Sequence, residues 1–112
     1  MNGPHGLSPR ALATITRVLA HHPAVEKALL FGSRAKGTHK PGSDIDLALI
    51  GTALDWRVLG RIYDEFDDSS LPHRFSLVIY DSTTDAEVAA HIQRVGLPLF
   101  DRELAGEAVL RR

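Results

Sequence analysis

Apolar residues along this chain recur with either a helical or a strand spacing, and the two kinds of segment alternate. Ser8 and Pro9 are a typical helix start, because serine caps free N–H groups and proline fits the first helical position. The helix that they open should end near residues 21–23. The elements predicted after it are a strand over 24–31, a turn of helix over 33–37 closed by Gly37, a strand over 44–50, a helix capped by Asp55, a strand over 73–80, a helix with a capping box from Thr84 to Glu87, and a short strand over 97–100.

This order of elements predicts an α/β domain with two layers, in which a small mixed β-sheet packs against helices. The 112 residues suffice for one compact domain, so we expect a single domain over 1–112. Its core should span about 8–100, and residues 101–112 are expected to be either helical or frayed. Apolar residues make up 44% of the chain and charged residues 24%, which argues against wholesale disorder.

Charge and composition argue against several functional classes. The net charge of -1 gives no overall basic field for a nucleic acid backbone, so direct nucleic acid binding is not expected. No segment has the roughly 20 apolar residues of a spanning helix, and we expect no membrane association. The absence of cysteine agrees with a reducing compartment, so a cytoplasmic protein is the expectation. The six histidines show no convincing ligand spacing, which favours surface or capping roles over a zinc site.

The segment "LLFGSRAKGTHKPGSDIDLALI", residues 29–50, contains two carboxylates at the start of an apolar strand. Side chains alternate along a strand, so Asp44 and Asp46 should share one face. Two such carboxylates repel each other unless water or a cation screens them, and hard oxygen ligands suit Mg²⁺. The pair therefore indicates a cation site, although the solvent face of an edge strand is an alternative that the pair alone leaves open.

Gly32 and Ser33 lie at the turn between the preceding strand and the short helix. A residue without Cβ lets a phosphate approach the backbone, and the serine hydroxyl and helix N–H groups are donors beside it. Taken alone, such a turn can be a plain connection. Its place next to the aspartate strand favours a single site that binds a phosphorylated ligand and a metal.

The run "GSRAKGTHKPGSDIDL" resembles the signature of the DNA polymerase β-like nucleotidyltransferase superfamily, and in particular its minimal nucleotidyltransferase (MNT) branch. The resemblance implies the polymerase β-like fold and a substrate that is ATP or another nucleoside triphosphate. It implies that Gly32 and Ser33 bind the triphosphate, and that Asp44 and Asp46 are catalytic residues that ligate Mg²⁺. Two metal ions can clamp the attacking and leaving oxygens of an in-line transfer.

Arg34 and Ser43 belong to the same run and are expected near the nucleotide. Arg34 could add positive charge beside the phosphates, with a solvated helix face as the alternative. Ser43 should fix the turn before the strand, because its short hydroxyl readily bonds nearby backbone.

The chain departs from the family pattern at Ser76. Active members carry a third carboxylate on the strand that corresponds to 73–80, where it ligates the catalytic metal and helps to deprotonate the acceptor hydroxyl. Alignment places Ser76 at that position, so the two-metal site is expected to be incomplete. Asp81 follows the strand at a position whose side chain should point to the face opposite that of Ser76, and only a bulge would turn it toward the site.

MNT proteins are commonly encoded beside HEPN-domain proteins as toxin–antitoxin pairs, so the resemblance implies a HEPN toxin as protein partner. The leading hypothesis is an antitoxin that transfers AMP from ATP to a hydroxyl of that partner. The alternative is a catalytically weakened, nucleotide-binding antitoxin that neutralises its partner by contact, which Ser76 favours. Nucleotidyl transfer to a small molecule is less favoured, because it usually needs an additional domain. The sequence is compatible with both a homo-oligomer and a hetero-complex.

Overall fold

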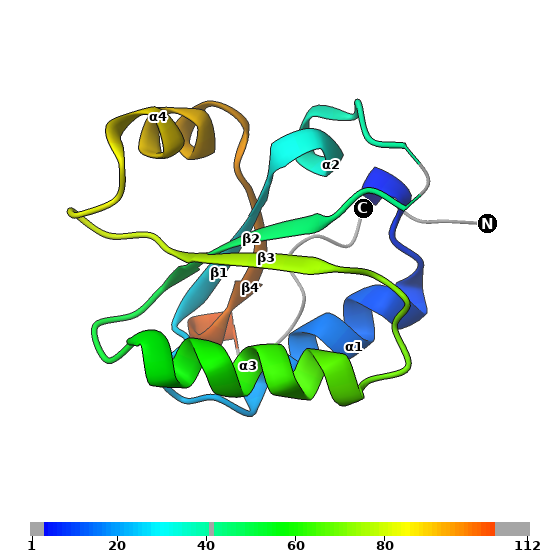
Figure 1. Cartoon of the computed structure of the whole chain (residues 1–112), viewed down its shortest axis with the longest axis horizontal. Coiled ribbons are helices and arrows are strands. Elements are labelled where there is room, and N and C mark those ends of the chain that lie inside the picture. The colour runs from blue at the N-terminus through cyan, green and yellow to red at the C-terminus, as the bar shows by residue number, and fades with distance from the viewer. Residues whose placement is uncertain (1–3, 41, 105–112) are drawn as a thin grey trace.

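The structure is a computed structural model that describes residues 4–40 and 42–104. A four-stranded sheet runs through its centre, and helices lie on both sides of the sheet (Figure 1). The elements in chain order are η1 (Pro4–Gly6), α1 (Pro9–Ala20), β1 (Lys27–Phe31), α2 (Gly32–Lys36), β2 (Ile45–Ile50), α3 (Trp56–Asp68), β3 (Phe75–Ile79), α4 (Ala86–Val95), β4 (Leu97–Asp101) and η2 (Arg102–Leu104). No helix among the described residues is long and apolar enough to cross a membrane.

The sheet has the strand order β3-β2-β1-β4 and is mixed, as the sequence predicts. The central pair β1 and β2 is antiparallel, β4 adds antiparallel to β1, and β3 adds parallel to β2. Asp46 is the register partner of Phe31 on one side and of Ser76 on the other. The end of β1, the start of β2 and the start of β3 therefore meet at one place.

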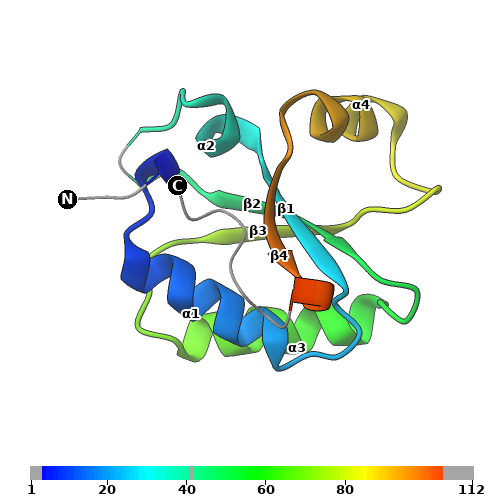
Figure 2. The ribbon, with the colours of Figure 1, turned by 180° about the vertical axis from the view of Figure 1, so that it is seen from behind.

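The main core lies between the sheet and the helices α1 and α3, which run side by side below it (Figure 2). A second and smaller cluster lies on the opposite face, where Ile92 of α4 packs against Phe31 and Ala48. Alternation along β2 separates the two, because Ile45, Leu47 and Leu49 point into the main core while Asp46 and Ala48 face the other way. Helix α4 thus covers a face of the sheet that the sequence did not assign to it.

The helix ends follow the predicted chemistry with one exception. Ser8 accepts a hydrogen bond from the backbone of α1, Asp55 does the same for α3, and Gly37 closes α2 in the left-handed conformation. The capping box from Thr84 to Glu87 is wrong, because Asp85 is the N-cap of α4 and its carboxylate accepts from the Glu87 N–H. The Thr84 hydroxyl instead closes the preceding turn by bonding the backbone of Asp81 and Ile79.

Arg102, directly after β4, ties this part of the chain to the end of α1. Its guanidinium donates to the carbonyl oxygen of Val25 at 2.8 Å and to that of His22 at 3.0 Å. It also lies within hydrogen-bond distance of the carbonyls of Leu19 and Ala20, which are among the last of α1. Helix ends leave such carbonyls without partners inside the helix, so one side chain satisfies several of them here.

Arg102→Ala should lower the free energy of unfolding by about 2–3 kcal/mol, because it removes several charge-assisted hydrogen bonds to partly buried carbonyls. For a domain of this size that corresponds to a fall in melting temperature on the order of 10 °C, measurable by thermal denaturation. Arg94→Ala, which removes an exposed arginine from α4, is the matched control and should change the melting temperature little. Equal melting temperatures for the two variants would contradict the role of Arg102.

Candidate active site

Gly32 and Asp46 are packed so closely that the site requires glycine at position 32. Gly32 is the first residue of α2 and has a φ of 74°, a conformation that L side chains rarely adopt. A Cβ atom placed on Gly32 would overlap the carboxylate of Asp46. The turn that the sequence associates with phosphate binding therefore lies against the aspartate strand, as predicted.

Asp46 lies on the face of the sheet opposite the main core and is half-buried within β2. Asp44 directly precedes β2 and is exposed. Burial raises the pKa of the Asp46 carboxyl, and the charge of Asp44 raises it further. The nearby side chains of His91 and Arg34 lower this pKa and oppose the shift only in part. An ionised Asp46 is thus unfavourable in the protein alone, and a bound cation would offset that cost.

Ser76 occupies the position beside Asp46 where the resemblance places a third carboxylate. The two residues are register partners on parallel strands, so their side chains share one face of the sheet. Asp81 does not replace the missing acid, because it is exposed beyond β3 and its carboxylate accepts from the N–H and hydroxyl of Thr83. Among the described residues no cluster of three acidic, histidine or cysteine side chains forms a metal site. Asp44 and Asp46 are therefore the two acids that could hold a cation here.

Arg34 lies inside the protein and not on a solvated helix face, since only 3% of its surface is exposed. Its guanidinium donates to the carbonyl oxygen of Ser43 at 2.9 and 3.3 Å and to that of His5 at 2.9 Å. Five fixed donors suit such a bidentate contact. Arg34 therefore holds the loop that leads into Asp44 in place, and its charge lies close enough to act on Asp46.

Ser43 fixes the turn before β2, as predicted. Its hydroxyl oxygen accepts from the Lys40 N–H at 2.8 Å, and its own N–H donates to the Lys40 carbonyl at 2.9 Å. Pro41, which the sequence places in the same turn, lies outside the described residues. A contact between Ser43 or Arg34 and a nucleotide remains a prediction.

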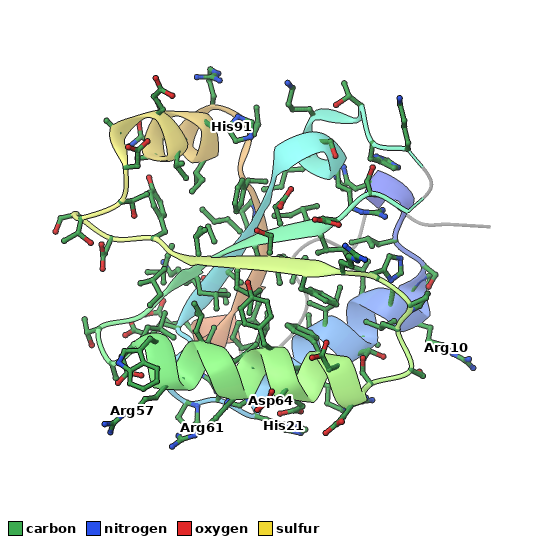
Figure 3. All side chains as sticks on the ribbon, in the orientation of Figure 1. Arg10, His21, Arg57, Arg61, Asp64 and His91 are labelled. Atoms are coloured by element: carbon green, nitrogen blue, oxygen red, sulfur yellow. The ribbon has the colours of Figure 1, made fainter. Side chains whose placement is uncertain are left out.

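His91 of α4 is a member of the site that sequence reasoning missed. Its Nε2 atom accepts a hydrogen bond from the Gly32 N–H at 3.2 Å, and its ring lies edge-on to Phe31 with the centroids 6.0 Å apart. Figure 3 shows this side chain on the part of α4 that faces α2. The available signal was its position on the apolar side of the helix, three residues after Val88 and four before Val95.

Two other histidines contact a carboxylate on a neighbouring helix. His21 and His22 follow α1, and both rings contact the carboxylate of Glu65 on α3, at 2.5 and 2.9 Å. They can do so because the helix ends before His22, so the chain no longer rotates each residue by a helical step. This pair links α1 to α3 away from the candidate active site.

Residues 13–104 match the family model described as polymerase beta, nucleotidyltransferase, and the chain belongs to this family. Among curated proteins, a probable protein adenylyltransferase MntA from Haemophilus influenzae is 36% identical over 74 residues. That match covers 65% of this chain and 64% of the relative, so the chain aligns with slightly under two thirds of the relative's length.

Solved structures agree with the family at the level of the fold. The chain superposes on a structure described as a toxin-antitoxin with AMP-PNP with a TM-score of 0.68 and 22% identity, covering 85% of this chain and 77% of the other. A complex from Shewanella oneidensis, described as a tri-AMPylated HEPN toxin with an MNT antitoxin, gives 0.61 and 19%, covering 84% and 72%. The predicted polymerase β-like fold is thereby confirmed.

Proposed function

We propose that this protein is a Mg²⁺-dependent nucleotidyltransferase that transfers AMP from ATP to a hydroxyl of a HEPN-domain partner, and so acts as the antitoxin of a pair. The observation that carries the proposal is the contact between the Gly32 turn and Asp46, which joins a phosphate-binding turn to an acid pair. The similarity to an MntA adenylyltransferase supports AMP as the transferred group. The similarity to MNT and HEPN complexes supports the partner.

In this reaction the acceptor oxygen attacks the α-phosphorus of ATP, the bond from that phosphorus to the pyrophosphate oxygen breaks, and the hydroxyl proton passes to solvent. Gly32 and Ser33 would bind the triphosphate through backbone N–H groups and the serine hydroxyl. Asp44 and Asp46 would hold Mg²⁺, which supplies positive charge that stabilises the leaving pyrophosphate. Arg34 keeps the loop before Asp44 fixed, so that the acids meet the phosphates in one geometry.

Ser76 favours a second candidate function, in which the protein binds nucleotide but neutralises its partner by contact. A serine neither accepts the hydroxyl proton readily nor ligates Mg²⁺ as a carboxylate does. The other residues of the site have the same roles in both candidate functions. The alternative therefore differs in whether the protein catalyses transfer, and not in its fold. The two differ in whether a nucleotide is consumed.

Intact-mass spectrometry of the product of the neighbouring gene, incubated with this protein, Mg²⁺ and each nucleoside triphosphate in turn, tests the proposal. We expect a mass gain of one or more AMP groups on the partner with ATP and none when Mg²⁺ is chelated. A stable complex whose partner never gains mass would reject AMP transfer and leave neutralisation by contact. A gain with a different triphosphate would keep the reaction and correct the nucleotide.

A further inference from the structure

The imidazole of His91 lies at the N–H group that begins the phosphate-binding turn. Its Nε2 atom and the Asp46 carboxylate lie against the same residue, because one accepts from the Gly32 N–H and the other fills the space where a Cβ would stand. The ring is partly exposed, so a ligand can reach it. Ser76 lies on the far side of Asp46, on β3, whereas His91 lies on the side of β1 and α2. His91 is thus on the triphosphate side of the proposed site and Ser76 on the acceptor side.

Packing of α4 on the sheet positions the ring beside Gly32. Its neighbour Ile92 is almost completely buried against Phe31 and Ala48, and the ring itself contacts the edge of Phe31. The ring lies beside the apolar cluster of α4, and the Gly32 N–H gives its Nε2 atom a hydrogen-bond partner. Because Nε2 accepts this bond, the proton of the neutral ring is assigned to Nδ1.

A phosphate oxygen is the other natural acceptor for the Gly32 N–H. When it takes that bond, it comes to lie where Nε2 was, and the imidazole must move by a small rotation about its side-chain bonds. A neutral imidazole always has one N–H, which can then donate to the same phosphate. The ring would exchange a weak neutral bond for one to a charged oxygen, which is the stronger kind.

We propose that His91 is a nucleotide-binding residue, which covers the Gly32 N–H in the free protein and donates to the β- or γ-phosphate of the bound triphosphate. This inference rests on the proposed function and adds a contact from α4 that the glycine–serine motif does not contain. In this role His91 contacts the part of ATP that leaves as pyrophosphate, and other residues contact the AMP part.

Titration calorimetry with Mg·ATP, magnesium pyrophosphate and AMP separates this role from a structural one. His91→Phe, which keeps a ring against Phe31, should weaken ATP and pyrophosphate binding about 10-fold or more and change AMP binding less than about 2-fold. His91→Gln can still accept from the Gly32 N–H and donate through its amide, so it should recover part of the loss for both ligands. Gln93→Phe, on the exposed side of α4, is the control and should change none of the three affinities.

An equal loss for all three ligands, or no loss for any, would overturn the assignment. Should His91→Phe fail to fold, His91→Gln provides the comparison, and a loss selective for ATP and pyrophosphate of about 3-fold is expected from it. If the natural protein binds neither ATP nor pyrophosphate in the presence of Mg²⁺, both the proposed function and the role of His91 are rejected. If the His91 variants lose affinity for all three ligands equally, only the role of His91 is rejected and the proposed AMP transfer is not affected.

Discussion

Asp46→Asn should reduce the affinity for Mg·ATP by about 100-fold or more and stop AMP transfer to the partner. Substitution of residues that only support a metal ligand costs about 10- to 100-fold, and loss of a ligand should cost at least as much. Asp46 lies between the Gly32 turn and Ser76, so its carboxylate is central to the proposed site. Calorimetry with Mg·ATP and intact-mass measurement of the partner give the two readouts.

The same substitution should leave the free protein as stable as before, or more stable. The folded protein raises the pKa of Asp46, first by burial and then through Asp44, so its ionised form costs stability at any pH above its unfolded pKa. A neutral amide removes that cost, and the melting temperature should therefore hold or rise. Asp64→Asn, on the exposed side of α3 (Figure 3), makes the same change of charge away from the site and should leave nucleotide binding unchanged. Undiminished binding by the Asp46 variant would reject the metal site.

Local rules sufficed for the part of the site that lies within one stretch of chain. The period of two along the aspartate strand predicts that Asp46 faces away from the main core, and the structure agrees, because Ile45 and Leu47 lie in that core. The same rule places Ser76 and Val78 of β3 on one face, and the register confirms that Ser76 lies beside Asp46. The facing of these side chains depends only on the alternation of residues along a strand, and the sequence pattern predicts that alternation directly.

His91 and Arg102 were missed because their contacts join distant parts of the chain. The Gly32–His91 bond spans 59 residues and the Arg102–His22 bond spans 80. Helical periodicity identifies the apolar side of 86–95 but does not say which face of the sheet that side covers. The face that a helix covers depends on the path of the loops before and after it. The partners of a long-range hydrogen bond therefore cannot be predicted from one segment alone.

The capping error at α4 has a different origin. In the run Thr84-Asp85-Ala86-Glu87 both of the first two side chains can cap a helix, and propensity ranks aspartate slightly above threonine. The turn after β3 decides between them, since it needs the Thr84 hydroxyl for the Asp81 N–H and so leaves Asp85 to the helix. Competing hydrogen-bond partners outside the helix thus set its first residue.

Ser76→Asp should increase the rate of AMP transfer by ~10² to 10⁴, which is the usual contribution of a general base. The new carboxylate would lie beside Asp46 and could both ligate Mg²⁺ and accept the proton of the incoming hydroxyl. Three acids on one face repel one another, so the variant should be less stable than the natural protein without Mg²⁺. Added Mg²⁺ should raise its melting temperature more than that of the natural protein, because binding to the folded state stabilises it.

Single-turnover transfer to the partner, followed by intact mass, measures this gain, and Ser82→Asp on the exposed turn after β3 is the control for the added charge. A gain confined to Ser76→Asp would show that the fold still holds an acceptor in line with the α-phosphate and lacks only the third acid. Equal rates for the natural protein and the Ser76 variant would contradict the incomplete site, since proton transfer would then need no carboxylate at this position. The natural protein could also inhibit the toxin although AMP transfer is too slow to explain the inhibition. This result would favour neutralisation by contact, because the complex and not the modification would then inhibit the toxin.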